Sequence, residues 1–522
     1  METNTGATTP ASKPRRRRAA RPRRPAAAAP RSQTPATERI GVAHLTAEYW
    51  PFARTGGLGE AVSGLATFQA AAGIPTTVVM PLYQLVRETT PSLERTGSPL
   101  AVTLAGHTER AWLYRVPDAA PGPRVFFIEH PDFFDRAGIY GDAGADYPDN
   151  ARRFAFFCLA ALTALPEIAP ETQVLHAHDW HTALAPVYLR TAFTGQSFHD
   201  RLAVVMSVHN AGFQGHFPAE TLAELGLAAE LYNPAVFEWY DRMNFLKGGL
   251  AFSDVAVTVS PTHARELRTA EGGFGLHDTF TTMGDRMTGI LNGIDPDLWN
   301  PETDQHIEAS YAGHALAGKR RCKAALQRAY GLPAEPHTPL FGMSARMVTQ
   351  KGLDLVLGAD LLATSDAQFI FLGAGERRYH EALADLAALV PHRVAVEFMF
   401  TDHLEHRLLA GADALLMPSL YEPCGLTQMR AQRYGTVPIA RRVGGLRDSI
   451  VDGETGFLFD EYTPAALERG VRRAVESYAD RTAWRKLTRA AMAQRFGWDR
   501  SAEEYLELYR RALAVRAASN PR

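Results

Sequence analysis

Two cations follow a predicted strand within the segment MSARMVTQKGLDL. The strand ends at about Ala345, and Arg346 and Lys351 come within the next six residues. Fixed cations at the carboxyl end of a strand suit a pyrophosphate leaving group, because they stabilise its developing charge without having to reorganise. The spacing therefore favours phosphate chemistry, although a solvated loop with ordinary surface charges would contain the same two residues.

A second segment, SLYEPCGLTQ, combines a carboxylate with a glycine turn. Glu422 follows the apolar run ALLMP, and Gly425, Leu426 and Thr427 are predicted to open a helix. Backbone N–H groups at a helix start bind phosphate oxygens, while a carboxylate accepts hydrogen bonds from sugar hydroxyls. The thiol of Cys424 could act as a nucleophile, but the sequence fixes no partner histidine, so we expect a small residue packed in a tight turn.

The segment EYWPFARTGGLGEAVSGLA is predicted to contain a glycine turn and a helix that begins near Glu60. Gly56, Gly57 and Gly59 let a ligand approach the backbone closely. Arg54 adds a cation beside the helix start, so a diphosphate fits this turn. The alternative is a turn with a purely structural role. The spacing is not GxGxxG, so the dinucleotide-binding fingerprint is not met.

Polar side chains also follow two predicted strands in the first half of the chain. His178 and Asp179 lie in VLHAHDWHTALAP, together with His181, and His209 lies in SVHNAGFQGHF. At strand ends such side chains enter a cleft. A His-x-His pair on an extended segment suggests a metal, but no cysteine or certain carboxylate completes a tetrahedral ligand set, so we expect none. Asp149, in YPDNARRF, precedes a helical run and is its N-cap, a functional carboxylate, or both.

Short apolar runs alternate with amphipathic stretches, which is typical of repeated βα units and a mostly parallel sheet. Two series of strands are predicted. The first covers residues 40–47, 76–80, 124–129, 173–177, 203–208 and 254–260. The second covers residues 339–345, 368–373, 393–399, 413–418 and 437–441. The predicted fold class is α/β, with two doubly wound halves.

The domain boundaries follow from local composition. The segment ILNGIDPDLWNPETDQ is rich in turn-forming residues, which predicts a hinge between the halves. The segment SAEEYLELYRRALAVR has Ser501 as a predicted N-cap and apolar residues at helical spacing, so we expect a final helix that packs back on the first domain. The predicted organisation is a tail over residues 1–38, domains over 39–290 and 306–490, a hinge over 291–305 and a C-terminal helix over 491–515.

Length and composition indicate a large globular protein. The 522 residues exceed what one hydrophobic core usually organises, and an apolar fraction of 46 % is ample for two cores. Three scattered cysteines without metal-ligand spacing suggest neither disulfides nor a zinc site, and the reducing cytoplasm fits them. No run approaches the length of a membrane span and no apolar core follows the basic N-terminus, so we expect neither a membrane partner nor a secretory signal.

The basic N-terminus stands apart from the rest of the chain. Residues 1–37 carry nine Lys or Arg and one Glu, a net charge of +8 in a chain whose total is −2. The stretch KPRRRRAARPRRPAAAAP lacks large apolar residues, so we predict disorder over residues 1–38. This tail could contact nucleic acid or another polyanion, but a solvated extension without a part in the chemistry is favoured.

In their order along the chain, these segments closely resemble the bacterial glycogen synthases and plant starch synthases. The resemblance runs from about Ile40 to Leu513 and rests on the motifs RTGGL, HAHDWH, HNAGFQG, NFLKGGL, LNGID, TQKGLDL, LGAGE, EPCGLTQ and GGLRD. It implies the GT-B architecture, two Rossmann-like domains facing a deep cleft. It also implies transfer of glucose from a nucleotide sugar, usually ADP-glucose in bacteria, to the non-reducing end of an α-1,4-glucan such as glycogen, with retention of configuration.

The resemblance further implies roles for individual residues. Arg346 and Lys351 would neutralise the diphosphate, and Glu422 would hold the glucose ring. His178 would contact the sugar near its 6-hydroxyl, and Asp149 would position donor or acceptor. No cofactor or metal is implied, because cations and helix N-termini carry the charge. The implied donor-binding residues are Arg54, Gly56, Gly57, Asn244, Cys424, Gly425, Leu426 and Thr427.

Three positions depart from the pattern of this family. Arg54 stands where lysine is usual, and the two cations are not interchangeable at a close phosphate contact. Glu60 replaces a common aspartate. Met429-Arg430 falls where many retaining GT-B enzymes carry a second glutamate, although glycogen synthases themselves commonly lack it.

Three alternative functions remain open at this point. An NAD-type oxidoreductase has a similar architecture, but the GxGxxG fingerprint is missing. A glucan phosphorylase is also GT-B, but the sequence contains no convincing lysine-centred pyridoxal site. A catalytically silent glucan-binding protein is supported only by the altered loop at Arg54.

Overall fold

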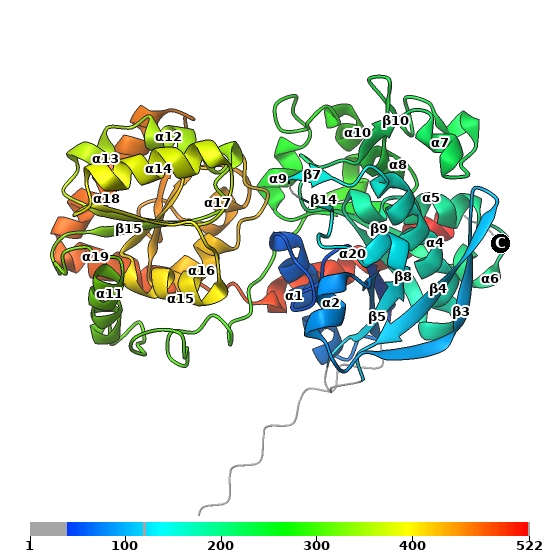
Figure 1. Ribbon diagram of the computed structural model, residues 1–522, viewed down its shortest axis with the longest axis horizontal. Helices are drawn as coiled ribbons and strands as arrows, with labels where there is room; N and C mark the ends of the chain where they lie inside the picture. Colours follow the sequence, from blue (N-terminus) through cyan, green and yellow to red (C-terminus); the bar gives the residue numbers. More distant parts are fainter. Residues whose placement is uncertain (1–38, 118–121, 143, 520–522) are drawn as a thin grey trace, which may run out of the picture. The chain divides into compact units, whose positions relative to one another are not determined.

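The computed structural model describes residues 39–117, 122–142 and 144–519 of the chain. Two large β-sheets carry helices on both faces (Figure 1). We call residues 40–290 the N-terminal lobe and residues 306–490 the C-terminal lobe. The basic tail predicted over residues 1–38 lies outside the described residues, so its predicted disorder stays a prediction.

The N-terminal lobe contains a nine-stranded sheet with the order β14-β13-β9-β8-β1-β2-β5-β4-β3. The first seven of these strands run parallel, and β4 and β3 form an antiparallel hairpin at one edge. The strands are β1 Gly41–Leu45, β2 Thr76–Pro81, β3 Glu94–Leu104, β4 His107–Arg115, β5 Arg124–Glu129, β8 Thr172–His178, β9 Ala203–Val208, β13 Val255–Thr258 and β14 Met287–Gly289. The main helices are α1 Gly57–Ala71, α4 Asn150–Ile168, α5 Leu184–Thr191, α8 Phe245–Ala251 and α9 Pro261–Glu266.

The central strands of this sheet are apolar because helices cover both of their faces. Every residue of β1, β2 and β9 is buried, and their sequences GVAHL, TTVVMP and AVVMSV lack the alternation of a half-exposed strand. The edge hairpin of β3 and β4 alternates between exposed and buried residues over part of its length. The sequences of β3 and β4 lack a continuous apolar run, and this hairpin was not among the predicted strands. Its turn, Ala105-Gly106, has φ angles of 48° and 81°, which suit a tight hairpin.

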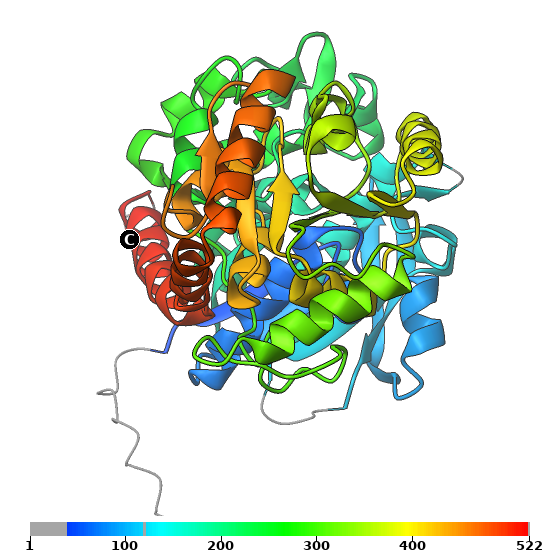
Figure 2. The ribbon, with the colours of Figure 1, turned by 90° about the vertical axis from the view of Figure 1, so that its left-hand side faces the viewer.

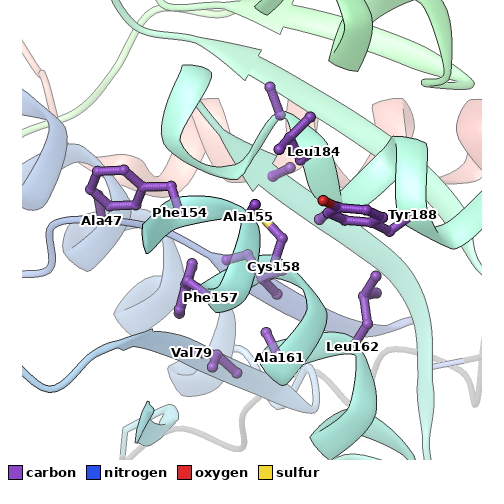
Figure 3. Packing of buried hydrophobic residues seen from close by; sticks show 14 of the residues in the cluster. Ala47, Val79, Phe154, Ala155, Phe157, Cys158, Ala161, Leu162, Leu184 and Tyr188 are labelled. Atoms are coloured by element: carbon purple, nitrogen blue, oxygen red, sulfur yellow. The ribbon is translucent and has the colours of Figure 1, made fainter. Parts of the chain in front are cut away.

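Helix α4 lies at the centre of the N-terminal core (Figure 3). Phe154, Phe157, Cys158 and Ala161 are fully buried, and the helix is apolar on most of its surface. Such a helix is stable only inside a core, which α4 shares with apolar residues of β2 and α5. This packing fixes the start of α4 and therefore the position of Asp149, the residue directly before it.

The C-terminal lobe contains a six-stranded parallel sheet with the order β17-β16-β15-β18-β19-β20. Helices α11, α15 and α16 cover one face, and α12 and α14 cover the other (Figure 1). The strands are β15 Leu340–Ser344, β16 Gln368–Leu372, β17 Val394–Glu397, β18 Ala414–Met417, β19 Val437–Arg441 and β20 Phe457–Phe459. The helices are α11 Ala317–Ala329, α12 Leu353–Leu357, α14 Arg377–Leu389, α15 Asp402–Gly411, α16 Thr427–Arg433, α17 Gly444–Ser449, α18 Pro464–Ala479 and α19 Arg481–Met492.

Each sheet has a point where the strand order reverses. In the first sheet β1 pairs with β2 on one side and with β8 on the other, and in the second β15 lies between β16 and β18. Loops leave the carboxyl ends of such neighbouring strands in opposite directions, which opens a crevice for a ligand. The segments predicted to carry chemistry follow β1, β8, β15 and β18, at residues 48–57, 179–182, 345–352 and 418–427.

The connector between the lobes is partly fixed to the C-terminal lobe. Trp299 stacks on His406, with 4.0 Å between the ring centroids. Oδ2 of Asp304 lies 2.8 Å from Nδ1 of His406 and accepts a hydrogen bond of 2.6 Å from the hydroxyl of Tyr434. The predicted hinge segment, residues 291–305, therefore connects the lobes, but its second half is held to the C-terminal lobe by Trp299 and Asp304.

The last helix, α20 Trp498–Ser519, packs against α1, β8 and β9 of the N-terminal lobe (red in Figures 1 and 2). Gly64 of α1 leaves the space for Trp498, because a Cβ at position 64 would lie 2.1 Å from the indole nitrogen. The prediction that Ser501 caps this helix is wrong. The helix begins at Trp498, three residues before Ser501. The Ser501 hydroxyl donates to the carbonyl of Leu291 instead of capping the helix.

The eleven strands predicted from the sequence are confirmed, each within two residues at either end. The two doubly wound halves are confirmed as well. Among the described residues, no helix is both long enough and apolar enough to cross a membrane.

We expect Phe157→Ala to destabilise the N-terminal lobe by about 3 to 5 kcal/mol, because the substitution leaves a cavity beside α4. Chemical denaturation followed by tryptophan fluorescence measures the shift. Glu167→Ala, at an exposed position of the same helix, is the matched control and should have little effect. Equal denaturation midpoints for Phe157→Ala and the unsubstituted protein would contradict the central role of α4.

Candidate active site

The loop after β15 is held against the loop after β18. Gly352 has a φ of 75°, and a Cβ at this position would lie 2.0 Å from the carbonyl oxygen of Pro418. Only glycine tolerates both the backbone conformation and this approach. The contact brings Lys351, just before the glycine, to Glu422 in the neighbouring loop.

Lys351 and Glu422 form an ion pair at the switch point of the C-terminal sheet. The distance from Nζ to Oε2 is 2.6 Å, and the Ser419 hydroxyl donates to the same oxygen at 3.0 Å. The Glu422 side chain is only 7 % exposed, so it needs a cationic partner at this depth. Arg346 is exposed, and no described residue forms a hydrogen bond or ion pair with its guanidinium. The structure thus pairs Lys351 with Glu422, and it leaves the guanidinium of Arg346, in the same loop as Lys351, without a partner among the described residues.

The turn EPCGL presents backbone donors beside this ion pair. Gly425 has a φ of 68°, and the Gln428 amide donates to the carbonyls of Cys424 and Gly425 at 3.0 and 2.9 Å. Within the described part of the chain, no group accepts a hydrogen bond from the N–H groups of Gly425, Leu426 or Thr427. Free N–H groups at the start of a helix attract an anion.

Helix α17 supports this turn from behind. A Cβ at Gly444 would lie 1.9 Å from the carbonyl oxygen of Glu422, and a Cβ at Gly445 would lie 2.0 Å from that of Cys424. Gly445 N–H donates to the Glu422 carbonyl at 3.1 Å. Cys424 is buried, and burial raises the pKa of its thiol to about 12, so the thiolate is not available at neutral pH. Cys424 therefore packs in the turn, as expected.

The glycine turn after β1 is organised by the buried carboxylate of Glu48, whose role was not predicted from the sequence. Glu48 accepts hydrogen bonds from the backbone N–H and the hydroxyl of Thr55, both at 2.7 Å, and from the Tyr140 hydroxyl at 2.6 Å. The N–H of Gly56 donates to it at 3.3 Å. A Cβ at Gly56 or Gly57 would meet nothing within 4 Å, so the outer side of the turn is open. Helix α1 begins at Gly57, earlier than the predicted start near Glu60.

The three positions that depart from the family pattern belong to one charge network. Arg54 forms ion pairs with Glu60 and with Asp402 of the C-terminal lobe. Arg430 pairs with Glu60 and, at 3.0 Å, with Glu405. Burial raises the pKa of Glu405 to about 7 and lowers the pKa of Arg430 to about 9. Arg54 therefore has two carboxylate partners in this structure, and a diphosphate must compete with them.

His178 lies inside the N-terminal lobe. The residue is only 1 % exposed. Its Nε2 lies 3.0 Å from Nδ1 of His44, and its Nδ1 lies 3.0 Å from Nε2 of His209. Burial lowers the pKa of His178 well below its usual value. His209 is partly exposed and no described residue bonds its Nδ1. The structure therefore favours His209 as the ring that faces a ligand, with His178 behind it.

The nitrogens of His44, His176 and His178 lie within 4.8 Å of one another, a spacing that could hold a metal ion. Each of the three rings, however, has hydrogen-bond partners on both nitrogens. The set includes no carboxylate to balance the charge of an ion at this depth. We interpret the cluster as a hydrogen-bond chain.

Asp179, next to this cluster, has a strained backbone. Its φ is 57°, which is unusual for a residue other than glycine, and its carboxylate accepts a hydrogen bond of 2.7 Å from the His209 N–H. Burial raises the pKa of Asp179 to about 7. Strained residues persist where the surrounding structure holds them, and they concentrate at functional sites.

Asp149 and Asn244 differ in what they can offer a ligand. Asp149 occupies the N-cap position of α4, but its side chain makes no capping hydrogen bond and instead forms two bonds of 2.8 and 2.7 Å with Arg136. It remains partly exposed. Asn244 is fully buried; its side chain caps α8 by accepting from the Lys247 N–H at 3.0 Å and donates to Gln214 at 2.6 Å. The structure favours a structural role for Asn244 rather than donor binding.

Asn292 is a further candidate that the sequence did not reveal as such. It is 6 % exposed, and its side-chain oxygen is buried without a hydrogen-bond partner in the described part of the chain. Its backbone hydrogen-bonds the thiol of Cys424, which places it beside the EPCGL turn. A buried unpaired acceptor is costly, and a ligand hydroxyl would satisfy it. The only sequence signal is its place in the motif LNGID.

Together these groups suit one kind of ligand. A diphosphate can be bound by the guanidinium of Arg346, by Lys351 in its pair with Glu422, and by the N–H groups of residues 425–427. Glu422, Asp179, Asp149 and the Asn292 oxygen are acceptors, which suit a molecule rich in hydroxyl groups.

Two families match the chain. Residues 41–282 match the family described as Starch synthase catalytic domain, and residues 331–491 match Glycosyl transferases group 1. The two matches correspond closely to the two lobes.

The chain is also similar to individual proteins over most of its length. Glycogen synthase 2 of Geobacter sulfurreducens is 40 % identical over 482 residues, which cover 91 % of this chain and 99 % of the relative. Glycogen synthase of Anaeromyxobacter dehalogenans strain 2CP-C is 42 % identical over 476 residues, or 90 % and 99 % of the two chains.

One similar solved structure is the catalytic domain of starch synthase IV from Arabidopsis thaliana, which was solved bound to ADP and acarbose. It aligns with this chain with a TM-score of 0.83 and 33 % sequence identity. The alignment covers 91 % of this chain and 99 % of that one. Sucrose-phosphate synthase from Thermosynechococcus elongatus shares the fold, with a TM-score of 0.59 and 18 % identity over 91 % and 100 % of the chains.

Acidification is expected to destabilise the protein through its buried neutral histidines. Burial lowers the pKa of His44 to about 4 and that of His181 and His209 to about 3, whereas an unfolded histidine titrates at about 6.5. Below pH 6.5 these histidines bind more protons in the unfolded chain than in the folded one, so their contribution to stability falls as the pH decreases from 6.5 toward 4. Asp179 and Glu405, whose pKa is raised to about 7, act in the opposite direction, but the histidines with a lowered pKa outnumber them. Thermal melting between pH 7 and pH 5 measures this loss. A melting midpoint that does not fall over this range would contradict the neutral buried state.

Proposed function

We infer the reaction of this chain from its family, because the chain belongs to the glycogen and starch synthase family of glycosyltransferases. Its two Rossmann-like lobes have the GT-B architecture. The chain is a glycogen synthase that transfers glucose from ADP-glucose to the non-reducing end of an α-1,4-glucan, with retention of configuration. The observation that carries this proposal is the cluster of Lys351, Glu422 and the free Arg346 at the switch point of the C-terminal sheet.

Donor binding would use the groups of the C-terminal lobe. Arg346 has no partner to give up among the described residues, so it takes diphosphate oxygens directly. Lys351 keeps one N–H on Glu422 and has two more donors for the phosphate, since an ammonium group donates three hydrogen bonds. The free N–H groups of residues 425–427 add a second set of donors. An ADP donor is in line with the Arabidopsis relative, which was solved with ADP.

The sugar and the acceptor would lie between these groups and the N-terminal lobe. Glu422 accepts hydrogen bonds from glucose hydroxyls through the oxygens that its ion pair with Lys351 leaves available. The N-terminal lobe offers the carboxylates of Asp149 and Asp179 and a ring nitrogen of His209. Arg54 would reach the diphosphate only after leaving Glu60 or Asp402.

Retention of configuration is explained best by front-face displacement. In this mechanism the departing phosphate oxygen helps to deprotonate the acceptor hydroxyl, so no protein nucleophile is needed. Cys424 is a poor nucleophile because of its raised pKa. Arg346, Lys351 and the backbone N–H groups stabilise the negative charge on the leaving diphosphate. We propose that the reaction needs no metal or other cofactor.

We propose a cytoplasmic location for the enzyme. Its three cysteines, at positions 158, 322 and 424, are buried and unpaired, as expected in a reducing compartment.

The donor is tested by incubating the purified chain with glycogen and either ADP-glucose or UDP-glucose, and by measuring nucleotide release and glucan elongation. We expect activity with ADP-glucose, and unchanged activity after dialysis against EDTA. Elongation with UDP-glucose alone would overturn the assigned donor, and loss of activity in EDTA that added metal restores would overturn the metal-free mechanism.

Lys351→Ala should lower kcat/KM at least about tenfold, or ~1.4 kcal/mol of transition-state stabilisation, because the diphosphate loses a cation and Glu422 loses its partner. Steady-state kinetics with ADP-glucose gives the value. Arg377→Ala, an exposed cation of α14, is the control and should behave like the unsubstituted enzyme. Kinetics of Lys351→Ala close to those of the control would reject the assigned role.

A further inference from the structure

The EPCGL turn is held from the N-terminal lobe as well as from its own lobe. Ser260, the N-cap of α9, donates its hydroxyl hydrogen to the carbonyl of Pro423 at 2.6 Å. The same hydroxyl oxygen accepts from the His263 N–H at 3.2 Å. A carbonyl only accepts and a backbone N–H only donates, so the direction of both bonds is fixed. Ser260 is fully buried, and both bonds are therefore shielded from water.

Helices α9 and α17 each supply a carboxylate to the start of the other helix. Glu266, the last residue of α9, accepts from the N–H of Gly444, the first residue of α17, at 2.9 Å. Asp448 of α17 accepts from the N–H and the hydroxyl of Thr262, in the first turn of α9, at 2.7 and 2.6 Å. The first N–H groups of a helix have no partner within the helix, and a carboxylate suits the positive end of the helix dipole. The two short helices therefore form one unit that belongs to both lobes.

This unit reaches the backbone of Glu422. Gly445 N–H donates to the carbonyl of Glu422 at 3.1 Å and to that of Pro423 at 3.2 Å. Pro423 has no N–H of its own to donate. Among the described residues, the two carbonyls are the only backbone groups of Glu422 and Pro423 that form hydrogen bonds. The backbone that carries the Glu422 side chain is thus held by α17 and by Ser260.

The side chain of Glu422 tolerates little movement of this backbone. Its Oε2 lies 2.6 Å from Nζ of Lys351, in a loop on the other side of the crevice. A shift of the turn would lengthen this ion pair, and it would also move the free N–H groups of residues 425–427. Misplacement of reacting groups by about 1 Å can cost on the order of a hundredfold in rate.

We propose that Ser260 and Glu266 are positioning residues, which act from the N-terminal lobe through Pro423 and Gly444 to hold the EPCGL turn in place for the donor. The part of this proposal that concerns the donor rests on the proposed glucosyl transfer. The part that concerns the order of the turn does not.

The test uses two variants that each remove one of these bonds. Glu266→Ala removes the acceptor of the Gly444 N–H, whereas Glu266→Gln keeps an acceptor oxygen and is the conservative variant that should restore the bond. Ser260→Gly removes the hydroxyl that donates to Pro423, while glycine at an N-cap position costs the helix little. Glu271→Ala, at an exposed position five residues after Glu266, is the matched control.

Hydrogen exchange without substrate, followed by mass spectrometry, is the first readout. Peptides that contain Leu420, Met429 and Gly445 report on the turn, because their N–H groups are hydrogen-bonded in or beside it. We expect exchange at these peptides to rise roughly fivefold in Glu266→Ala and in Ser260→Gly, which corresponds to the loss of one hydrogen bond. A peptide of strand β15 should be unchanged, because neither bond contacts that strand.

Steady-state kinetics with ADP-glucose and glycogen is the second readout. Glu266→Ala and Ser260→Gly should each lower kcat/KM for ADP-glucose roughly tenfold, because the groups that bind the diphosphate are displaced. The KM for glycogen should stay within about twofold of the control, since the turn belongs to the donor side. Glu266→Gln should recover most of the lost activity.

Exchange at the turn that equals that of Glu271→Ala would overturn the proposal. A rise of the same size in the β15 peptide would overturn it as well, because it would show general destabilisation of the lobe. Altered exchange with kinetics equal to those of the control would overturn the role in the reaction. If the unsubstituted protein fails to elongate glycogen, the proposed function is wrong, and the exchange data still decide whether Ser260 and Glu266 order the turn.

Discussion

The structure of the candidate site depends on the ion pair of Lys351 and Glu422. A carboxylate that is almost fully buried has to be matched by a cation, and here the two come from different loops. Their meeting requires two close backbone approaches, one of Gly352 to Pro418 and the other of Gly444 to Glu422. The strand order places both loops at the point where the sheet reverses direction. Packing, glycine positions and topology thus all serve to hold one charged pair beside a row of free N–H groups.

A second charge network explains three unusual residues together. Arg54, Glu60 and Arg430 each depart from the family pattern, and the structure connects them through shared carboxylates that include Glu405 and Asp402. An arginine can bond two carboxylates at once through its planar fork, which a lysine does less well. The substitution at position 54 is therefore matched by its neighbours. An anion that bound to Arg54 would have to replace these internal carboxylates, so its affinity would reflect the difference between two sets of ionic contacts.

Much of the fold and part of the site could be predicted from the sequence. Parallel strands buried on both faces have continuous apolar runs, which is why all eleven predicted strands are present, whereas the partly polar edge strands β3 and β4 gave no such signal. Arg346, Lys351 and Glu422 could be singled out because residues after parallel strands gather at one edge, and the structure pairs the last two of them. The roles of His178, Asn244 and Glu48 depend on contacts between residues far apart in the sequence. His44, for example, lies 134 positions from His178, so neither burial nor bonding of that ring follows from local pattern.

The position of α20 has a consequence for biosynthesis. Its residues Trp498, Tyr505, Leu508 and Tyr509 pack with Ile40, Val42 and Val174 in one apolar cluster, so the first strands to leave the ribosome are covered by a segment translated hundreds of residues later. Until then, one face of the first sheet remains open on the nascent chain. Exposed apolar surface of this kind is prone to aggregation and is a substrate for chaperones. The first lobe to be synthesised is thus the last to complete its core.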